Sequence, residues 1–235
     1  MRAPIARVAL AVVTGAGSGI GKATALALAG RGLDVALVGR TESTLRETAA
    51  AVEKSGVRAL VSVADVGVAA DVQRMADAVT SGLGTPVLVV NNAGTAGRKV
   101  RIEAVEDAEW DAVLGANLRG LFLVTRAFLP SMRTARVGRF VTVGSISSTL
   151  GTAGLAPYCA SKWGALGFTK SVAEELRGSG LQALAVLPGT VDTPMAQVGG
   201  FIPRMSAAEV ARVIVYAGLD APPAMNGSAI ECFGS

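Results

Sequence analysis

The sequence predicts an α/β protein whose single domain is built on a doubly wound, mainly parallel sheet. Short apolar runs of strand length alternate with longer helical segments along all 235 residues. The runs are apolar at consecutive positions, which is typical of parallel strands that helices cover on both faces. Seven such strands with six crossovers predict one sheet flanked by helices. No linker and no internal repeat divides residues 1–235.

The predicted elements follow one another in alternation along the chain. The strand segments are apolar and β-branched, and the segments between them are longer and have helical spacing. Strands are expected at 8–14, 34–38, 58–64, 86–91, 138–144, 181–187 and 228–233. Helices are expected at 19–31, 42–55, 70–81, 106–134, 155–177 and 206–219.

Local signals support the expected ends of these helices. Gly32, Gly56 and Gly178 follow the first, second and fifth helices, where a left-handed backbone commonly ends a helix. Ser206 and Glu209 have the spacing of a capping box, which predicts the start of the last helix.

The composition excludes several classes of protein. Hydrophobic residues make up 51% of the chain and charged residues 17%, which is the reverse of the pattern of disorder. Because there is no His, the chain has no Ser-His-Asp or Cys-His nucleophile and no His-ligated zinc. Cys159 and Cys232 form no CxxC pair, so we expect no metal site and a cytoplasmic location. No unbroken apolar stretch predicts a membrane span.

Basic residues outnumber acidic residues by 22 to 18, but they are dispersed. Arg119, Arg126 and Arg133 recur every seven residues in the fourth predicted helix, and we expect them on a side that faces solvent. Nucleic-acid binding would also need groove-entering or base-stacking elements. Only two Trp, two Tyr and six Phe are spread over the chain, so no nucleic-acid partner is expected.

A glycine cluster lies between the first predicted strand and the first helix. Gly15, Gly19 and Gly21 fall within residues 14–21, where the chain must turn and begin a helix. Glycine lets the backbone approach a pyrophosphate, and the amides at a helix N-terminus attract its negative charge. Any tight turn can use glycines, but the position after the first strand of a parallel sheet predicts a dinucleotide site.

The end of the second predicted strand distinguishes the two nicotinamide cofactors. A carboxylate there binds the ribose 2′-hydroxyl of NAD(H) and repels the 2′-phosphate of NADP(H). In this chain Gly39 is followed by Arg40, and Asp34 lies at the opposite end of the strand. A guanidinium can bind phosphate through two parallel N–H groups, so NADP(H) is favoured over NAD(H). Asp65 and Val66, after the third strand, are expected beside the adenine, although such an Asp can equally cap a helix.

Three residues further along the chain predict acid–base chemistry. Ser145 follows the fifth strand, and Tyr158 and Lys162 lie four positions apart on the fifth helix, on one face. A phenol with a pKa near 10 is a poor acid or base at neutral pH, but a nearby ammonium favours the phenolate and is expected to lower that pKa. The Ser145 hydroxyl would bind the substrate oxygen.

Together these motifs are similar to those of the short-chain dehydrogenase/reductase family, over almost the whole chain. The resemblance implies a Rossmann-like fold and hydride transfer by a nicotinamide cofactor. The motifs that carry it are Thr14-Gly15-x-x-x-Gly19-x-Gly21, Asn91-Asn92-Ala93-Gly94, Asn117, Ser145, Tyr158-x-x-x-Lys162 and Pro188-Gly189-x-Val191-x-Thr193.

The resemblance implies a role for each matching residue. Tyr158 would be the general acid/base, and Lys162 would bind the nicotinamide ribose and lower the pKa of Tyr158. Ser145 would orient the substrate carbonyl, and Asn117 would help to hold a water that relays protons to Lys162. Cofactor contacts are further implied for Gly15, Ser18, Gly19, Ile20, Gly21, Arg40, Asp65, Val66, Asn92, Ala93, Gly94, Pro188, Gly189, Val191 and Thr193.

The function that the resemblance implies is hydride transfer between NADP(H) and an apolar ketone or secondary alcohol. One alternative is the same chemistry with NAD(H), because Ser18 stands where many NADP-dependent relatives carry a basic residue. A second alternative is a dinucleotide sensor or scaffold without turnover. It is disfavoured because Asn117, Ser145, Tyr158 and Lys162 are all present.

Two further expectations concern the substrate and the assembly. Residues 194–205 are apolar and include the adjacent glycines Gly199 and Gly200, so we expect a loop that closes over the substrate. The helix at 155–177 is apolar on more than one face. Relatives assemble through their fourth and fifth helices, so a homodimer or homotetramer is expected.

Overall fold

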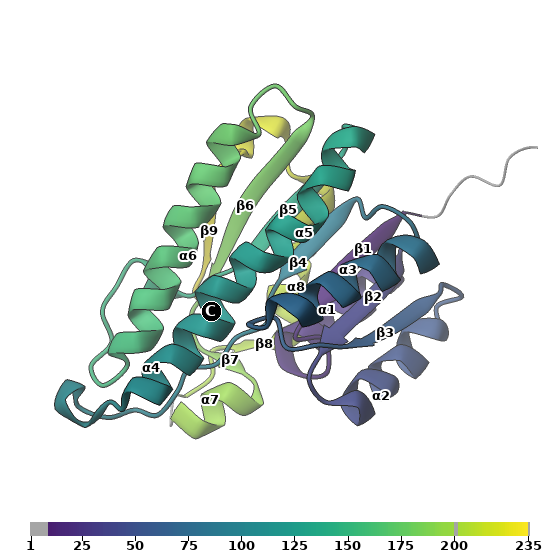
Figure 1. Cartoon of the computed structure of the whole chain (residues 1–235). Helices are drawn as coiled ribbons and strands as arrows, with labels where there is room; N and C mark the ends of the chain where they lie inside the picture. The colour runs from purple at the N-terminus through teal and green to yellow at the C-terminus, as the bar shows by residue number, and fades with distance from the viewer. Residues whose placement is uncertain (1–8, 200–201, 235) are drawn as a thin grey trace, which may run out of the picture.

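One seven-stranded parallel sheet runs through the computed structural model, which describes residues 9–199 and 202–234 (Figure 1). The strand order is β3-β2-β1-β4-β5-β6-β9, so the order reverses between β1 and β4. At such a reversal the connecting loops diverge and leave a crevice at the carboxyl edge of the sheet. The strands are β1 (Leu10–Thr14), β2 (Asp34–Gly39), β3 (Ala59–Val63), β4 (Leu88–Asn91), β5 (Gly138–Val143), β6 (Leu181–Pro188) and β9 (Ala229–Cys232).

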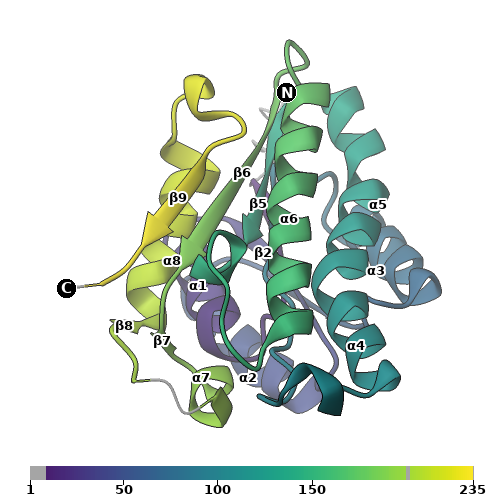
Figure 2. The same ribbon diagram turned by 90° about the vertical axis from the view of Figure 1, so that its left-hand side faces the viewer.

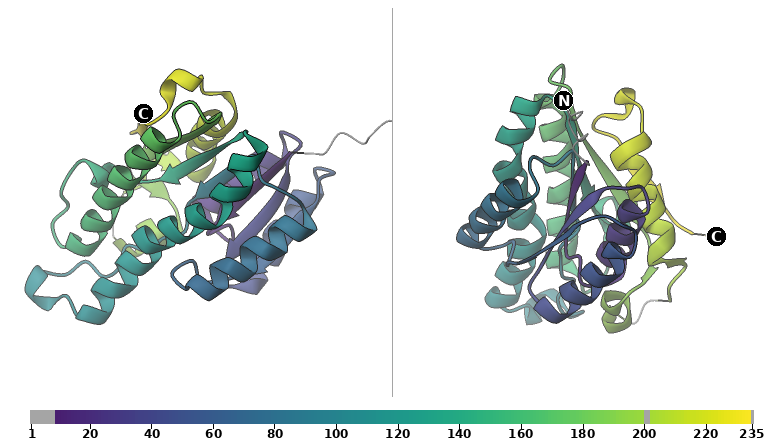
Figure 3. Two further views of the ribbon diagram at one scale, coloured as in Figure 1. Left: turned by 45° about the horizontal axis from the view of Figure 1, so that its top comes forward. Right: turned by 90° about the vertical axis from the view of Figure 1, so that its right-hand side faces the viewer.

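Helices cover both faces of this sheet, as the edge-on views show (Figures 2 and 3). Helices α1, α2 and α8 pack on one face, and α3, α5 and α6 pack on the other. The helices are α1 (Gly19–Ala29), α2 (Glu42–Glu53), α3 (Ala69–Gly82), α4 (Asp107–Leu114), α5 (Gly120–Ala135), α6 (Ala156–Glu175), α7 (Pro194–Gly199) and α8 (Ala207–Val215).

Successive residues of the central strands face two separate cores. In β1, Ala11 and Val13 pack with side chains of α1 and α8, whereas Leu10 and Val12 pack with side chains of α3 and α5. Side chains alternate along a strand, so a strand that is covered on both sides must be apolar at every position. This explains the consecutive apolar runs in the sequence.

The structure confirms the doubly wound parallel sheet and every predicted strand and helix. The ends differ by at most two residues when the π-helical segments Gly115–Arg119 and Tyr216–Asp220 are counted with the helices that they adjoin. Val8, at the start of the first predicted strand, lies outside the described residues. Gly32, Gly56 and Gly178 have φ angles of +82°, +80° and +73°, so the predicted helix ends are confirmed.

The capping box at the start of α8 is also confirmed. The Glu209 N–H donates to the Ser206 hydroxyl at 3.2 Å, and the Ser206 N–H donates to the Glu209 carboxylate at 2.7 Å. The two residues therefore satisfy each other's otherwise unpaired backbone N–H groups.

Two predicted helices contain a π-helical segment that the sequence does not reveal. Gly115–Arg119 separates α4 from α5, and Tyr216–Asp220 follows α8. A π-helical segment widens the helix locally without ending it, so the apolar spacing on either side still reads as one helix.

The prediction of a continuous loop at 194–205 is wrong in its first half. The segment begins with α7, whose first residue is Pro194, and ends at β8 (Met205–Ser206), which pairs with β7 (Val191–Asp192). Proline suits the first position of a helix because its φ angle is preset and its missing N–H is not needed there. Gly200, part of the predicted pair of glycines, lies outside the described residues.

The helix that spans Asp107–Ala135 is long and apolar enough to cross a membrane by length and composition alone. Its residues Leu123, Val124 and Phe128 are buried in the core beside the sheet, and core helices of this kind meet the same criterion.

The predicted exposed arginine face of this helix is confirmed. Arg126, for example, stacks over the exposed Phe122 ring at 4.7 Å from its centroid.

Candidate active site

The turn between β1 and α1 requires glycine for two reasons. Gly15 and Gly19 have φ angles of +66° and +50°, in the left-handed region. A Cβ on Gly21 would lie 2.1 Å from the Gly15 carbonyl oxygen, so no side chain fits there. Ser18, which precedes α1, makes no side-chain cap hydrogen bond. The turn therefore presents bare backbone and a helix N-terminus, which fits the pyrophosphate of a dinucleotide.

Strands β1 and β4 are tied together beneath this turn. The Thr14 hydroxyl accepts hydrogen bonds from the N–H groups of Asn92 and Ala93, each at 3.0 Å, and donates to the Val90 carbonyl at 3.3 Å. The Asn92 amide donates to the carbonyl oxygens of Thr14 at 2.9 Å and Gly15 at 3.3 Å. The shape of this cradle is thus fixed by the protein's own hydrogen bonds.

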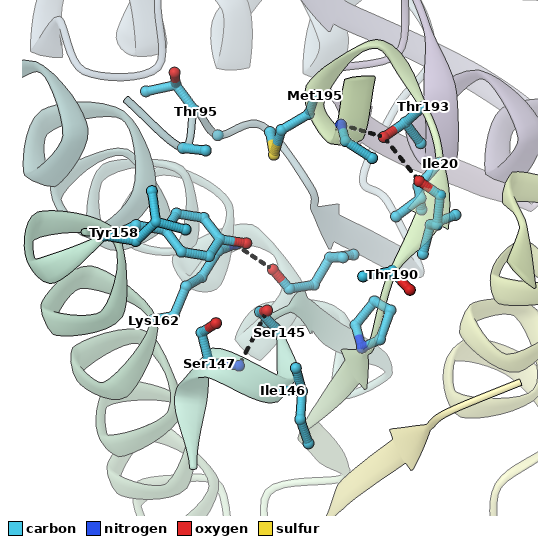
Figure 4. A pocket seen from close by; sticks show the side chains of 18 of the residues that line it. Ile20, Thr95, Ser145, Ile146, Ser147, Tyr158, Lys162, Thr190, Thr193 and Met195 are labelled. Atoms are coloured by element: carbon cyan, nitrogen blue, oxygen red, sulfur yellow. Dashed lines mark hydrogen bonds between the residues drawn. The ribbon is translucent and has the colours of Figure 1, made fainter. Parts of the chain in front are cut away.

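A cavity of about 520 Å³ opens beside this cradle at the carboxyl edge of the sheet (Figure 4). This volume lies in the range of small-molecule and cofactor sites. The cavity is lined by twelve of the residues that the sequence analysis assigned to catalysis or cofactor binding: Ser18, Ile20, Arg40, Asn92, Gly94, Ser145, Tyr158, Lys162, Pro188, Gly189, Val191 and Thr193.

Ser145, Tyr158 and Lys162 come together in this cavity (Figure 4). Ser145 follows β5, and its hydroxyl accepts the N–H of Ser147 at 3.1 Å. Tyr158 and Lys162 lie one turn apart on α6, with the Lys162 Nζ atom 5.6 Å from the centroid of the Tyr158 ring. That Nζ donates to the Val143 carbonyl at 2.9 Å. The ammonium is therefore buried beside the phenol and does not point to bulk solvent.

Burial controls the acid–base properties of this pair. It lowers the pKa of the Lys162 ammonium from 10.5 to about 8. It also raises the pKa of the Tyr158 phenol above its usual value, and this effect exceeds the opposing effect of the Ser145 hydroxyl. A net lowering of the pKa of Tyr158, as the sequence predicts, is therefore not found in this arrangement, because the loss of hydration is the largest influence on the phenol.

Asn117 lies behind Lys162, in the π-helical segment. Its carboxamide accepts the N–H of Thr95 at 2.8 Å and donates to the Thr95 carbonyl at 2.9 Å and to the Ser161 hydroxyl at 2.8 Å. Asn117 and Lys162 line a second, small cavity of about 10 Å³ together with Asn91, whose buried Oδ1 atom has no hydrogen-bond partner among the described residues. A polar cavity of this size has room for one water.

Other predicted residues lie beside the main cavity, at the small cavity or at a neighbouring groove. Arg40 is exposed and lines both the main cavity and a neighbouring groove that Asp65 also lines. The Asp65 carboxylate accepts the Gly67 N–H at 2.8 Å and so stabilises the local turn. Its alternative interpretation as a helix cap is wrong, because the N-cap residue of α3 is Val68. Val66 is buried, and a Cβ on Gly120 would lie 2.6 Å from its side chain.

One wall of the cavity was not assigned to catalysis or cofactor binding by the sequence analysis. It comes from the loop after β4, from the segment between β5 and α6, and from the start of α7, which lies in the predicted substrate loop at 194–205. For the segment after β5, the hydroxyl-rich run after Ser145 is a sequence signal that could have indicated part of it. The lining of this wall includes Thr95, Lys99, Ile146, Ser147, Thr152, Leu155, Thr190 and Met195.

Comparison with known proteins agrees with this geometry. The profile of a family described as short chain dehydrogenase matches residues 9–199. A Streptomyces virginiae protein named as the ketoacyl reductase of a monensin polyketide synthase is 43% identical over 190 residues, which cover 80% of this chain and 72% of that protein.

Two further relatives match over nearly their full length. The 3-oxoacyl-(acyl-carrier-protein) reductase FabG of Pseudomonas aeruginosa is 33% identical, with 96% of each chain covered. The crystal structure of levodione reductase has a TM-score of 0.90 and 31% sequence identity, with 95% of each chain covered.

Proposed function

The chain belongs to the short-chain dehydrogenase family, and on that premise we propose that it is an NADP(H)-dependent reductase of apolar ketones, or the corresponding dehydrogenase of secondary alcohols. The observation that carries the proposal is the buried pair Tyr158 and Lys162 beside the Ser145 hydroxyl, in a cavity with an apolar wall. Relatives named as ketoacyl and levodione reductases support a carbonyl substrate.

The nicotinamide, when bound, supplies the hydride that reduces the carbonyl carbon. The Ser145 hydroxyl donates a hydrogen bond to the carbonyl oxygen and so fixes the orientation of the substrate. Tyr158 then gives its proton to this oxygen as the alkoxide forms, which yields the secondary alcohol. The Lys162 ammonium stabilises the phenolate that is left. Asn117 and the small cavity beside it would hold a water that relays protons to Lys162.

The preference for NADP(H) rests on Arg40. Its guanidinium lies at the cavity, directly after β2, and the buried carboxylate of Asp34 is at the other end of that strand, bound to Arg58 at 2.6 Å. No carboxylate among the described residues lines the cavity to repel a 2′-phosphate. NAD(H) is the alternative, because Ser18 offers no second positive charge.

The proposal is tested by following NADPH absorbance with a panel of apolar ketones, and the same panel with NADH. Turnover with NADPH at a higher kcat/KM than with NADH is the expected result. Tight cofactor binding with no turnover on any ketone would contradict the proposal and support a dinucleotide sensor.

We also propose that the chain acts as a cytoplasmic homo-oligomer. Support comes from three aromatic side chains, Trp110 on α4, Phe122 on α5 and Trp163 on α6, which are 38%, 39% and 53% exposed. Exposed aromatic side chains are typical of surfaces that bind another protein. Light scattering at micromolar concentration should give a dimer or tetramer, and a monomer would contradict this part of the proposal.

A further inference from the structure

A buried amide oxygen at the small cavity behind Lys162 has no partner in the fold. It belongs to Asn91, the last residue of β4, which is only 7% exposed. The Nδ2 group of this amide donates to the Thr125 hydroxyl of α5 at 3.3 Å. Its Oδ1 atom has no donor among the described residues. A buried acceptor without a donor destabilises the fold, so a donor from outside the chain is expected beside it.

Two other buried side-chain oxygens lack a partner but lie in different surroundings. The Thr24 hydroxyl and the Gln182 Oε1 atom are also without a hydrogen bond within residues 9–199 and 202–234. Neither residue lines the main cavity or the small cavity. Asn91 does line the small cavity. Because Thr125 engages the Nδ2 end of its planar amide, Oδ1 is the polar atom that Asn91 offers to an occupant.

The size and the lining of the small cavity limit this occupant to one water molecule. The volume of about 10 Å³ corresponds to a single water. The lining comes from β1, β4, β5, α5, α6, the π-helical segment and the turns after β3 and β4. Lys162 is the only titratable side chain in this described lining, so no carboxylate is present to bind a cation. A buried water needs at least two polar partners, and Asn91 Oδ1 and the Lys162 ammonium supply an acceptor and a donor.

The Lys162 ammonium has protons available for this water. It carries three, and one goes to the Val143 carbonyl at 2.9 Å. Within the described part of the chain, no other side chain or backbone group accepts the remaining two. Lys162 lines both cavities, so one proton can point to the water while another faces the main cavity. Burial lowers the pKa of this ammonium to about 8, which lets it give up and regain a proton near neutral pH.

We propose that Asn91 is a positioning residue for proton return: its Oδ1 atom accepts a hydrogen bond from the water in the small cavity and so turns a lone pair of that water toward Lys162. Asn91 does not line the main cavity, so it acts only through this water. The inference rests on the proposed ketone reduction and adds a residue to its proton transfer.

The protons of this step balance over one turnover. Tyr158 gives one proton to the alkoxide, and Lys162 replaces it. Lys162 then takes one proton from the water in the small cavity, and the water takes one from solvent. Ala116 lines both this cavity and the neighbouring exposed groove, so solvent lies one residue away. Without an acceptor at Asn91 the water has no fixed orientation, and the proton returns to Lys162 more slowly.

The test replaces Asn91 with leucine, which has a similar shape and cannot accept a hydrogen bond. The readouts are the Kd for NADPH and the steady-state kcat for the best ketone of the panel, measured in H₂O and in D₂O. We expect Asn91→Leu to lower kcat by about tenfold, as for the loss of one hydrogen bond at a proton-transfer step, and to leave the Kd unchanged. The solvent isotope effect on kcat should rise, because the return of the proton becomes the slow step.

Gln182→Leu is the matched control. It removes another buried amide whose oxygen has no partner among the described residues, from strand β6. Because Gln182 lines neither cavity, kcat and its solvent isotope effect should equal those of the wild-type chain. The melting temperature of each variant shows whether the fold is retained.

A crystal structure of the wild-type chain with NADP(H) gives a second measurement, which does not depend on the folding of any variant. We expect an ordered water within about 3.2 Å of both the Asn91 Oδ1 atom and the Lys162 Nζ atom. A small cavity without this water overturns the inference.

The kinetic outcomes are equally decisive. An unchanged kcat in folded Asn91→Leu overturns the inference. A lower kcat with an unchanged isotope effect also overturns it, because Asn91 would then have a structural role only. A wild-type chain that binds NADPH but reduces no carbonyl compound overturns the proposed function instead, and the crystal structure still decides whether Asn91 holds the water.

Discussion

The two sides of the main cavity are held together by different kinds of interaction. On the cofactor side, backbone groups of β1, β4 and the glycine turn are tied to one another through Thr14 and Asn92. On the substrate side, the loop after β4 meets the segment before α6 through a backbone hydrogen bond between Val100 and Gly154, and side chains form most of the wall. The surface of the cofactor side thus consists largely of backbone groups, which Thr14 and Asn92 hold in place. On the substrate side, by contrast, the side chains themselves determine the shape and polarity of the wall. Substitutions on the two sides should therefore have separable effects.

The largest expected effect tests this separation at the phenol of Tyr158, the proposed proton donor. Tyr158→Phe removes the proton donor but keeps the ring, so kcat should fall by about 1,000-fold while the Kd for NADPH changes by less than about threefold. Single-turnover kinetics and fluorescence titration measure the two quantities. Tyr216→Phe is the control, because Tyr216 is exposed on the opposite side of the sheet. Retained turnover in Tyr158→Phe would show that another group supplies the proton.

The second prediction concerns the effect of the buried Lys162 ammonium on the stability of the fold. Burial holds the pKa of Lys162 at about 8, against 10.5 for a solvated lysine, so the folded chain binds this proton less readily than the unfolded chain. The resulting destabilisation is full below pH 8 and disappears as the pH rises to about 10.5. Lys162→Met should therefore increase the free energy of unfolding by up to about 3 kcal/mol at pH 7, and by progressively less above pH 8.

Urea denaturation at several pH values between 7 and 10.5 measures this difference in the free energy of unfolding. The range runs from below the pKa of Lys162 in the folded chain, about 8, to that of a solvated lysine, 10.5. Lys170→Met, which removes an ammonium from an exposed position on the same helix, is the matched control. Parallel profiles for the wild-type chain and Lys162→Met would mean that burial does not shift the pKa of this ammonium.

The third prediction tests the rigidity of the cofactor side. Gly21→Ala places a Cβ 2.1 Å from the Gly15 oxygen and 2.6 Å from the Asn92 amide nitrogen, and both are held by the hydrogen bonds of the cradle. We expect a loss of about 2 kcal/mol in the free energy of unfolding, together with weaker NADPH binding. Gly30→Ala, at the other end of α1, is the control, because its Cβ would meet nothing closer than 3.5 Å. Equal stability of the two variants would show that the cradle can relax.

The smallest of these effects distinguishes the two cofactors. Arg40→Asp should weaken NADPH binding by at least about tenfold and change NADH binding by less than about threefold, because only NADPH carries the 2′-phosphate. Isothermal titration with each cofactor measures this. Arg46→Asp makes the same change of charge on α2, where Arg46 pairs with Glu42, and should affect both cofactors equally. Equal losses for NADPH and NADH in Arg40→Asp would rule out a 2′-phosphate role.

The cofactor side could be predicted from the sequence because its determinants are local. Glycines at 15, 19 and 21 are required by the backbone itself, and the carboxyl ends of parallel strands meet at one edge. The same rule placed Ser145 after β5 near Tyr158 and Lys162. Sequence spacing was sufficient wherever function depends on where a strand ends or on one turn of a helix.

The substrate side and the acid–base balance could not be predicted in this way. The pKa of Tyr158 depends on how much water the surrounding loops exclude, which no local pattern encodes. The contact between Ser147 and Thr152 depends on the path of a five-residue connection. The start of α7 at Pro194 had a local signal, but the apolar residues and glycines that follow it favoured a loop.

The wider helical turn at Gly115–Arg119 also restricts how the chain length can vary between α4 and α5. A π-helical turn holds one residue more than an α-helical turn, so a single-residue deletion there would restore α-helical winding. Each residue turns an α-helix by about 100°, so such a deletion would rotate Asn117 away from Thr95 and Ser161, its partners at present. A deletion of one residue between α4 and α5 would thus break the hydrogen bond from Asn117 to Ser161 on α6, although every other element of the fold could stay in place.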